Sequence, residues 1–246
     1  MDVSVCMATY NGLPFVLDQV RSILRELDFD DELVIVDDCS SDGTAEALLS
    51  LVDGRIVLLQ NEINLGVVRS FSKSLETAKG EYIFLSDQDD IWKAGRVALM
   101  KEAMDLCGYN LVTSNFEWID ENNNSIYINY DGVSENNSSN YYRNILDIFI
   151  GKTNYFGCAM LIRRPLLYIA LPIPDFVESH DLWLAKVGNL SRSNVHMNSQ
   201  TFLKRKHTRN ASSVISTRPL YLKVFSRIIF IWSIIRIKLR ILLRIN

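Results

Sequence analysis

The first 92 residues alternate four strand-like runs with three helix-like segments, and this alternation constrains the fold more than any other feature. The apolar runs cover residues 3–8, 32–36, 55–59 and 81–86, and apolar residues recur at helical spacing in 15–27, 45–51 and 67–78. Strands that alternate with helices form parallel sheets, because a helix must carry the chain back before the next strand starts. We therefore predict an α/β fold with a mostly parallel central sheet flanked by helices.

Polar clusters follow three of these strands where each strand ends. They are Thr9-Tyr10-Asn11, Asp37-Asp38 and the acidic cluster Asp87-Gln88-Asp89-Asp90. In open α/β sheets ligands bind at the carboxyl ends of the strands. The three clusters are therefore predicted to share one edge, and that edge is the expected binding site.

The acidic cluster places three carboxylates within four residues, which is unfavourable unless a positive charge relieves the repulsion. Hard oxygen ligands at a strand end suit Mg2+ or Mn2+, and such ions often bridge to a substrate diphosphate. An acidic turn exposed to water is the alternative. Ile91 and Trp92 follow directly, so the chain re-enters buried structure and the metal site is favoured.

The second half is less regular. We predict strands at 110–118 and 155–162, with an Asn- and Ser-rich loop or hairpin at 120–140 between them. Residues 178–181 open a helix that continues through residues 182–185. Acidic residues favour the first turn of a helix, so Asp181 is either a helix-start residue or a functional carboxylate.

Charge is distributed very unevenly along the chain. No Asp or Glu follows Asp181, whereas 13 of the 26 Lys and Arg residues do. This asymmetry predicts an anionic partner, either nucleic acid or a membrane surface. The Ile-rich composition of the C-terminal region argues against nucleic acid, because phosphate contact favours solvated basic residues and stacking aromatics.

The last segment, residues 216–246, is a basic and apolar tail. Its run at 228–235 is apolar except for Ser233, and it is too short for the roughly 20 apolar residues that a spanning helix needs. We predict an amphipathic helical tail that lies in the membrane interface. Its basic residues do not form one stripe at helical pitch, so we expect a kinked helix or two short ones. The alternative is a terminal helix packed on the core, with snorkelling basic side chains.

Other patterns exclude some classes of protein. The four cysteines form no C-x-x-C pair, so their spacing predicts neither a zinc site nor a disulfide framework and fits a reducing compartment. The first residues lack the basic start and long apolar run of a signal peptide. No G-x-G-x-x-G follows the first strand, which argues against a dinucleotide-dependent enzyme.

The motifs, taken in order, resemble those of family 2 glycosyltransferases, which have the GT-A nucleotide-diphospho-sugar transferase fold. Two later segments resemble those that carry the catalytic base and a final H-x-x-N. The resemblance covers roughly residues 3–210, and its Asp-Gln-Asp-Asp-Ile-Trp form is most similar to bacterial enzymes of O-antigen and capsule synthesis. The sequence departs from the family pattern at Leu203 and Lys206. The matching segments are residues 8–11, 36–44, 64–66, 80–92, 179–183 and 204–210.

The resemblance implies a role for each matching residue. Asp181 is the implied catalytic base. Tyr10 and Asp38 would hold the nucleotide base, Asp87 would lie near the ribose, and Asp89 would bind Mn2+ or Mg2+. His207 is either a metal or diphosphate ligand or a surface histidine. The full implied sets are Thr9, Tyr10, Asn11, Asp38 and Asp87 for the nucleotide sugar, and Asp87, Asp89, Asp90 and His207 for the metal.

The resemblance also implies the domain organisation. Residues 1–215 would form the GT-A glycosyltransferase domain, with a nucleotide-binding half at about 1–92 and an acceptor half at about 93–215. Residues 216–246 would be the membrane-associating tail. The protein would be cytoplasmic and attached peripherally to the inner face of the bacterial cell membrane.

The reaction that the resemblance implies is an inverting hexosyl transfer with a β-linked product, in O-antigen or other surface polysaccharide synthesis. Glucose or galactose would move from a UDP-sugar to a polyprenyl-diphosphate-linked acceptor of the GlcNAc-diphospho-undecaprenol type. A dTDP-rhamnose rhamnosyltransferase is an alternative donor assignment. A non-catalytic nucleotide-binding protein at the membrane surface is an alternative of another class.

Overall fold

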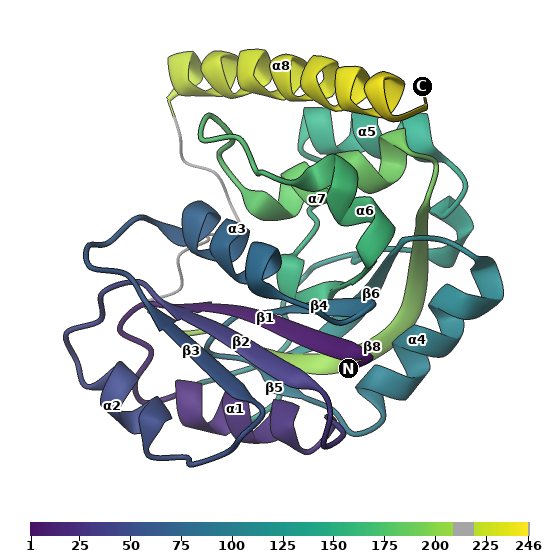
Figure 1. Ribbon diagram of the computed structural model, residues 1–246. Coiled ribbons are helices and arrows are strands. Elements are labelled where there is room, and N and C mark those ends of the chain that lie inside the picture. The colour runs from purple at the N-terminus through teal and green to yellow at the C-terminus, as the bar shows by residue number, and fades with distance from the viewer. Residues whose placement is uncertain (209–218, 246) are drawn as a thin grey trace.

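The computed structural model describes residues 1–208 and 219–245. One mixed eight-stranded sheet runs through the molecule in the order β3-β2-β1-β4-β7-β6-β8-β5 (Figure 1). Its strands are β1 (Val3–Thr9), β2 (Glu32–Asp37), β3 (Ile56–Gln60), β4 (Tyr82–Ser86), β5 (Ile91–Trp92), β6 (Leu111–Ile119), β7 (Met160–Arg163) and β8 (Asn194–Arg205).

The N-terminal half has the parallel organisation that the alternating pattern predicts. Strand β1 pairs in parallel with β2 and β4, and β2 pairs in parallel with β3. The helices between them are α1 (Val16–Leu24), α2 (Thr44–Leu49) and α3 (Val67–Thr77). The α/β class with helices on both sides of the sheet is therefore confirmed.

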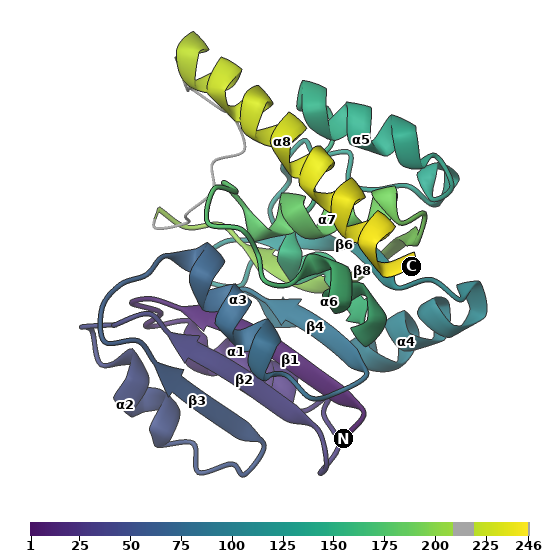
Figure 2. The same ribbon diagram turned by 45° about the horizontal axis from the view of Figure 1, so that its top comes forward.

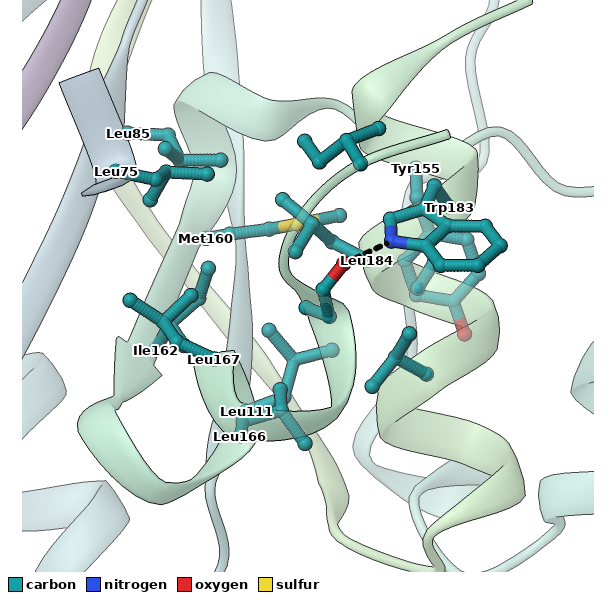
Figure 3. Packing of buried hydrophobic residues seen from close by; sticks show 14 of the residues in the cluster. Leu75, Leu85, Leu111, Tyr155, Met160, Ile162, Leu166, Leu167, Trp183 and Leu184 are labelled. Atoms are coloured by element: carbon teal, nitrogen blue, oxygen red, sulfur yellow. Dashed lines mark hydrogen bonds between the residues drawn. The ribbon is translucent and has the colours of Figure 1, made fainter. Parts of the chain in front are cut away.

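Two separate hydrophobic cores lie on the two faces of the sheet. One contains Val20 and Ile23 of α1 and Met100 of α4 (Arg96–Cys107). The other joins Leu75 of α3 to the C-terminal helices, and Figure 3 shows its side chains packed around Trp183. Because both faces are covered, the central strands can be almost entirely apolar.

The second half of the sheet is mixed. Strand β7 runs antiparallel to both β4 and β6, while β8 is parallel to β6 and antiparallel to β5. The predicted strand at 155–162 is too long, since residues 155–156 precede a 3-10 turn, η2 (Gly157–Ala159), and the strand starts only at Met160. Segment 120–140 is mostly loop with a short 3-10 turn, η1 (Glu135–Asn137).

The C-terminal helices stack on one side of the sheet. They are α5 (Tyr141–Ile150), α6 (Arg164–Ala170), α7 (His180–Leu190) and α8 (Leu220–Ile245), and Figure 2 shows α8 running beside α5 and passing over α7. The expectation of a kinked or double helix is wrong, because α8 is a single helix of 26 residues. Packing explains this: Phe230 and Ile237 are buried in the core beneath it, and Arg240 Nη1 donates to the carbonyl oxygens of Ile169 and Ala170 at 2.8 and 2.9 Å.

No described helix is both long enough and apolar enough to cross a membrane. The predicted domain boundary at 215/216, and Asn210 of the H-x-x-N segment, lie outside the described residues.

Candidate active site

The carboxyl ends of β1, β2 and β4 meet at one edge of the sheet. The pairing register sets Thr9 against Asp37 and Met7 against Ser86, so the three polar clusters follow strands that end level with one another. The expectation that they share an edge is confirmed.

Gln88 connects the turn after β4 to the carboxyl end of β1. Its Oε1 accepts a hydrogen bond from the Thr9 hydroxyl at 2.6 Å and another from the Tyr10 N–H at 2.8 Å, and its Nε2 donates to the Tyr10 carbonyl oxygen at 3.2 Å. Thr9 is buried, whereas the Tyr10 residue is 48% exposed. The tyrosine ring is therefore available to stack on a flat ligand, and Thr9 positions the turn that carries it.

Asn11 and Asp38 organise the turns beside that ring. Asn11 has a φ of +48°, which Asn tolerates better than most residues, and its Oδ1 accepts the Ser41 N–H at 2.9 Å. The buried Asp38 carboxylate accepts the backbone N–H groups of Leu65 and Gly66, both at 2.8 Å. These bonds fix the loop before α3, and contact of Asp38 with a nucleotide base stays a prediction.

The acidic turn after β4 encloses a lysine. The Lys204 Nζ lies 3.0 Å from Asp87 Oδ2, 3.6 Å from Asp90 Oδ2 and 3.4 Å from the Cys158 Sγ. Burial opposes its charge, but Asp90, Cys158 and Asp87 together hold the pKa of Lys204 well above its usual value. Burial opposes the charge of Asp87 as well, but the nearby Lys204 ammonium holds the pKa of the Asp87 carboxyl below its usual value.

Asp90 is the most buried carboxylate of the turn. Burial raises the pKa of Asp90 to about 7. The Lys204 charge lowers this pKa, and the nearby charges of Asp89 and Asp87 raise it. Its Oδ1 accepts the Arg205 N–H at 3.0 Å, while Oδ2 accepts no hydrogen bond from any described residue. Arg205 also donates through Nε to the Asp89 carbonyl oxygen at 2.9 Å, so β8 holds the turn from behind.

Asp89 and His207 form a second pair at the outer side of the turn. The His207 Nε2 lies 2.7 Å from Asp89 Oδ2, and the histidine ring is tilted against Phe15. A carboxylate and an imidazole are suitable ligands for Mn2+. A hollow of about 450 Å³ adjoins this pair, lined by Asp120, Glu121, Asn122, Lys206, His207 and Thr208.

The residues of this edge fit a divalent cation at two places. One is the Asp89–His207 pair. The other is the group formed by Asp87, Asp90 and Cys158, whose ligand atoms all lie within 4.8 Å of one another. Lys204 already contacts all three members of that group. In the Asp89–His207 pair, by contrast, His207 lines the hollow and lies 2.7 Å from Asp89.

Asp181 lies in the first turn of α7, but it does not cap the helix. Ser179 is the N-cap and its hydroxyl oxygen accepts the Leu182 N–H at 3.3 Å. The Asp181 Oδ1 lies 2.6 Å from His180 Nε2 in a geometry that makes no hydrogen bond, and it finds no hydrogen-bond partner among the described residues. An unsatisfied, largely buried carboxylate oxygen is a candidate proton acceptor.

Segment 157–158 connects Asp181 to the acidic turn. On one side a Cβ at Gly157 would be 2.5 Å from Asp181 Oδ1, and on the other the Cys158 Sγ contacts Lys204. Burial raises the pKa of the Cys158 thiol well above its usual value, and the nearby charges of Asp87, Asp90 and, least of the three, Asp181 raise it further. The candidate base and the acidic turn thus belong to one site.

Lys204, Arg205 and Gly157 were not among the site residues expected from the sequence, and neither was any of the four cysteines. Lys204 and Arg205 stand in a basic segment with no mark to separate buried from exposed cations. The pairing of Ile91 with Leu203 in the β5–β8 ladder is what brings them against the acidic turn.

Known proteins are similar to this chain in sequence and in fold. The profile of the family "Glycosyl transferase family 2" matches residues 4–168. A UDP-Glc:alpha-D-GlcNAc-diphosphoundecaprenol beta-1,3-glucosyltransferase, WfgD of Escherichia coli, is 30% identical over 225 residues, which are 90% of this chain and 82% of that protein. The putative teichuronic acid biosynthesis glycosyltransferase TuaG of Bacillus subtilis is 34% identical over 48% of this chain and 51% of its own length.

Solved structures of low sequence identity have the same fold. S. aureus TarS in complex with UDP-GlcNAc superimposes with a TM-score of 0.70 at 18% identity, over 94% of this chain and 66% of that one. The mannosyltransferase PcManGT of Pyrobaculum calidifontis, in complex with GDP-Man and Mn2+, has a TM-score of 0.63 at 16% identity, over 97% of this chain and 73% of that one. With its strand-end site, its family match and a relative that aligns with 90% of it, this chain belongs to glycosyl transferase family 2 and is a glycosyltransferase with the GT-A fold.

Proposed function

We propose that this protein is an inverting hexosyltransferase that moves glucose or galactose from a UDP-sugar to an N-acetylglucosamine-diphospho-undecaprenol type of acceptor, with a β linkage. The observation that carries the proposal is the unsatisfied Asp181 oxygen beside the acidic turn. The relative that acts on such a donor and acceptor aligns with 90% of this chain. The activity of that relative supports the choice of sugar and lipid.

The donor would bind along the carboxyl ends of β1, β2 and β4. The half-exposed Tyr10 ring offers a stacking surface for the nucleotide base. Among the described residues, Asp38 Oδ2 accepts a hydrogen bond from the Gly66 N–H alone, so a second acceptor position on that oxygen can take a base N–H. Asp87 faces the same edge and would lie near the ribose.

The metal would be Mn2+ or Mg2+, held by Asp89 and His207. When bound, a divalent ion neutralises the charge that develops on the departing nucleoside diphosphate. The chain supports that ligand pair from beneath, because Arg205 fixes the Asp89 carbonyl and Phe15 packs on the His207 ring.

Asp181 would accept the proton of the acceptor hydroxyl. A sugar hydroxyl is a weak nucleophile at neutral pH, and a base within hydrogen-bond reach accelerates its attack. A single displacement by this hydroxyl, from the face opposite the nucleotide, inverts the anomeric centre. An α-linked donor then gives a β-linked product.

Helix α8 supports attachment to the membrane that carries the acceptor. Its outer side exposes large apolar side chains, among them Ile228, Trp232, Ile235 and Leu239. Lys223, Arg236 and Lys238 are exposed on the same helix, and no acidic residue follows Asp181. An apolar stripe with basic flanks and no carboxylates matches an anionic lipid surface. We therefore place the protein at the cytoplasmic face of the bacterial cell membrane, attached peripherally through this helix.

A donor screen with a synthetic N-acetylglucosamine-diphospho-lipid tests the proposal. We expect transfer from UDP-glucose or UDP-galactose in the presence of Mn2+, and a β linkage in the product. Transfer from dTDP-rhamnose alone would support the alternative donor instead. Asp181→Ala should lose turnover and keep UDP binding, while UDP binding without transfer from any donor by the native protein would indicate the non-catalytic alternative.

A further inference from the structure

Lys204 is a buried cation enclosed by the acidic turn. The residue is only 6% exposed, and the ring of Phe156 lies 5.2 Å from its Nζ. A buried ammonium is strongly destabilising unless anionic partners surround it. Asp87 and Asp90 provide those partners at 3.0 and 3.6 Å.

The backbone determines where Lys204 lies. Strand β8 is paired on both sides, and its register sets Leu203 against Ile91 of β5 and Lys204 against Trp118 of β6. The next residue, Arg205, binds the acidic turn through its N–H and its guanidinium. Lys204 is therefore held among the carboxylates by the sheet as well as by its own charge.

The atoms around Lys204 are those that a metal ion would use. Asp87, Asp90 and Cys158 offer two carboxylates and a sulfur whose ligand atoms lie within 4.8 Å of one another. The Lys204 Nζ lies within 3.6 Å of an atom of each. An ammonium at this position donates a hydrogen bond to Asp87, lies in ion-pair contact with Asp90 and occupies the space where an ion would bind.

We propose that Lys204 is a positioning residue that takes the place of a divalent ion between Asp87 and Asp90, so that the protein binds one metal ion, at Asp89 and His207, and excludes a second. The inference rests on the proposed metal-dependent transfer. It divides the four sequence-predicted metal ligands into two groups: Asp89 and His207 bind the ion, and Asp87 and Asp90 bind the lysine. The acidic turn therefore has its shape before metal and donor arrive.

Metal titration of the native protein with UDP is the first test. Free Mn2+ measured by electron paramagnetic resonance should show one bound ion per chain. Asp89→Asn should weaken binding about tenfold or more, and Asp90→Asn less than about threefold. Two ions bound by the native protein, or an equal loss in both variants, would overturn the proposal.

A gain-of-binding variant is the second test. Lys204→Met should bind a second ion, and with Co2+ it should show a thiolate-to-cobalt absorption band in the near ultraviolet that the native protein lacks. The band should vanish in Lys204→Met/Cys158→Ser. Lys204→Arg, which keeps the charge, should bind one ion as the native protein does. Lys152→Met, at an exposed lysine that follows α5 and lies outside the proposed site, is the matched control and should also bind one.

These outcomes separate the two proposals. If the native protein binds no ion in the presence of UDP, the metal-dependent transfer is wrong. If it binds one ion that requires Asp90, only the role of Lys204 is wrong. Should Lys204→Met fail to fold, the comparison of Asp89→Asn with Asp90→Asn still decides, because it needs no change at Lys204.

Discussion

Gly157→Ala tests the role of Asp181 without changing any titratable residue. A Cβ at position 157 would lie 2.5 Å from Asp181 Oδ1 and 2.9 Å from His180 Nε2. Ordinary non-bonded contacts between heavy atoms begin near 3.5 Å, so the carboxylate must retreat by about 1 Å. His180 cannot make room easily, because its ring stacks on Phe71 with centroids 3.9 Å apart.

A displacement of this size has a predictable cost. Misplacing a catalytic group by about 1 Å lowers the rate by about 10²-fold, equivalent to about 2.7 kcal/mol in the activation free energy. We expect kcat to fall by that factor. The KM for the sugar nucleotide should stay unchanged, because Tyr10 and Asp38 follow other strands of the sheet.

The assay is steady-state transfer to the lipid acceptor, with the melting temperature measured in parallel. Gly54→Ala is the matched control, since a Cβ there meets no described atom within 4 Å. In the Asp181→Asn background, Gly157→Ala should cause almost no further loss, because both changes remove the same function. A Gly157→Ala protein with native kcat, or losses that simply multiply in the double variant, would refute Asp181 as the base.

Three further predictions follow from the described contacts. Burial lowers the pKa of His196 from its ordinary value of 6.5 to about 4, so between these pH values the unfolded chain binds a proton that the folded chain does not. The free energy of unfolding should therefore fall by about 3 kcal/mol as the pH drops from 6.5 to 4, and denaturant titrations of His196→Gln should lack this contribution. The double variant Ile228→Glu/Trp232→Glu should bind anionic liposomes at least about tenfold more weakly in a flotation assay. The control Phe29→Glu/Val52→Glu should bind as the native protein does. Equal recovery of the two double variants in the liposome fraction would contradict attachment through α8. Excess chelator should lower transfer about 10²-fold and Mn2+ should restore it, whereas full activity in chelator would exclude the metal.

The parallel half of the fold could be predicted because its signals are local. Strands buried on both faces are continuous apolar runs, and polar residues follow where each strand leaves the sheet. The cluster after Ser86 and the pair after Val36 were therefore recognisable from order alone. Their juxtaposition followed from parallel pairing.

The second half could not be predicted to the same degree, because its signals are non-local. Strand β8 (Asn194–Arg205) contains buried polar residues such as Asn194 and His196. They are satisfied by partners distant in sequence, as when His196 Nε2 meets the Tyr155 hydroxyl at 2.8 Å. No periodic pattern marks such a strand. The same holds for α8, whose inner and outer sides are both apolar and differ only in what packs against them.

By itself, the sequence determined the fold class, the edge of the sheet where the polar clusters meet and the types of side chain that gather there. Only the tertiary structure decided which charges meet, namely Lys204 with Asp87 and Asp90, and His207 with Asp89. It also brought Gly157 against the Asp181 carboxylate. The physical reason is that residue type and the local spacing of apolar residues indicate only whether a position is buried in the core. The partner of a buried charge depends instead on the register between strands whose residues are more than 100 positions apart in the sequence, as Asp87 and Lys204 are.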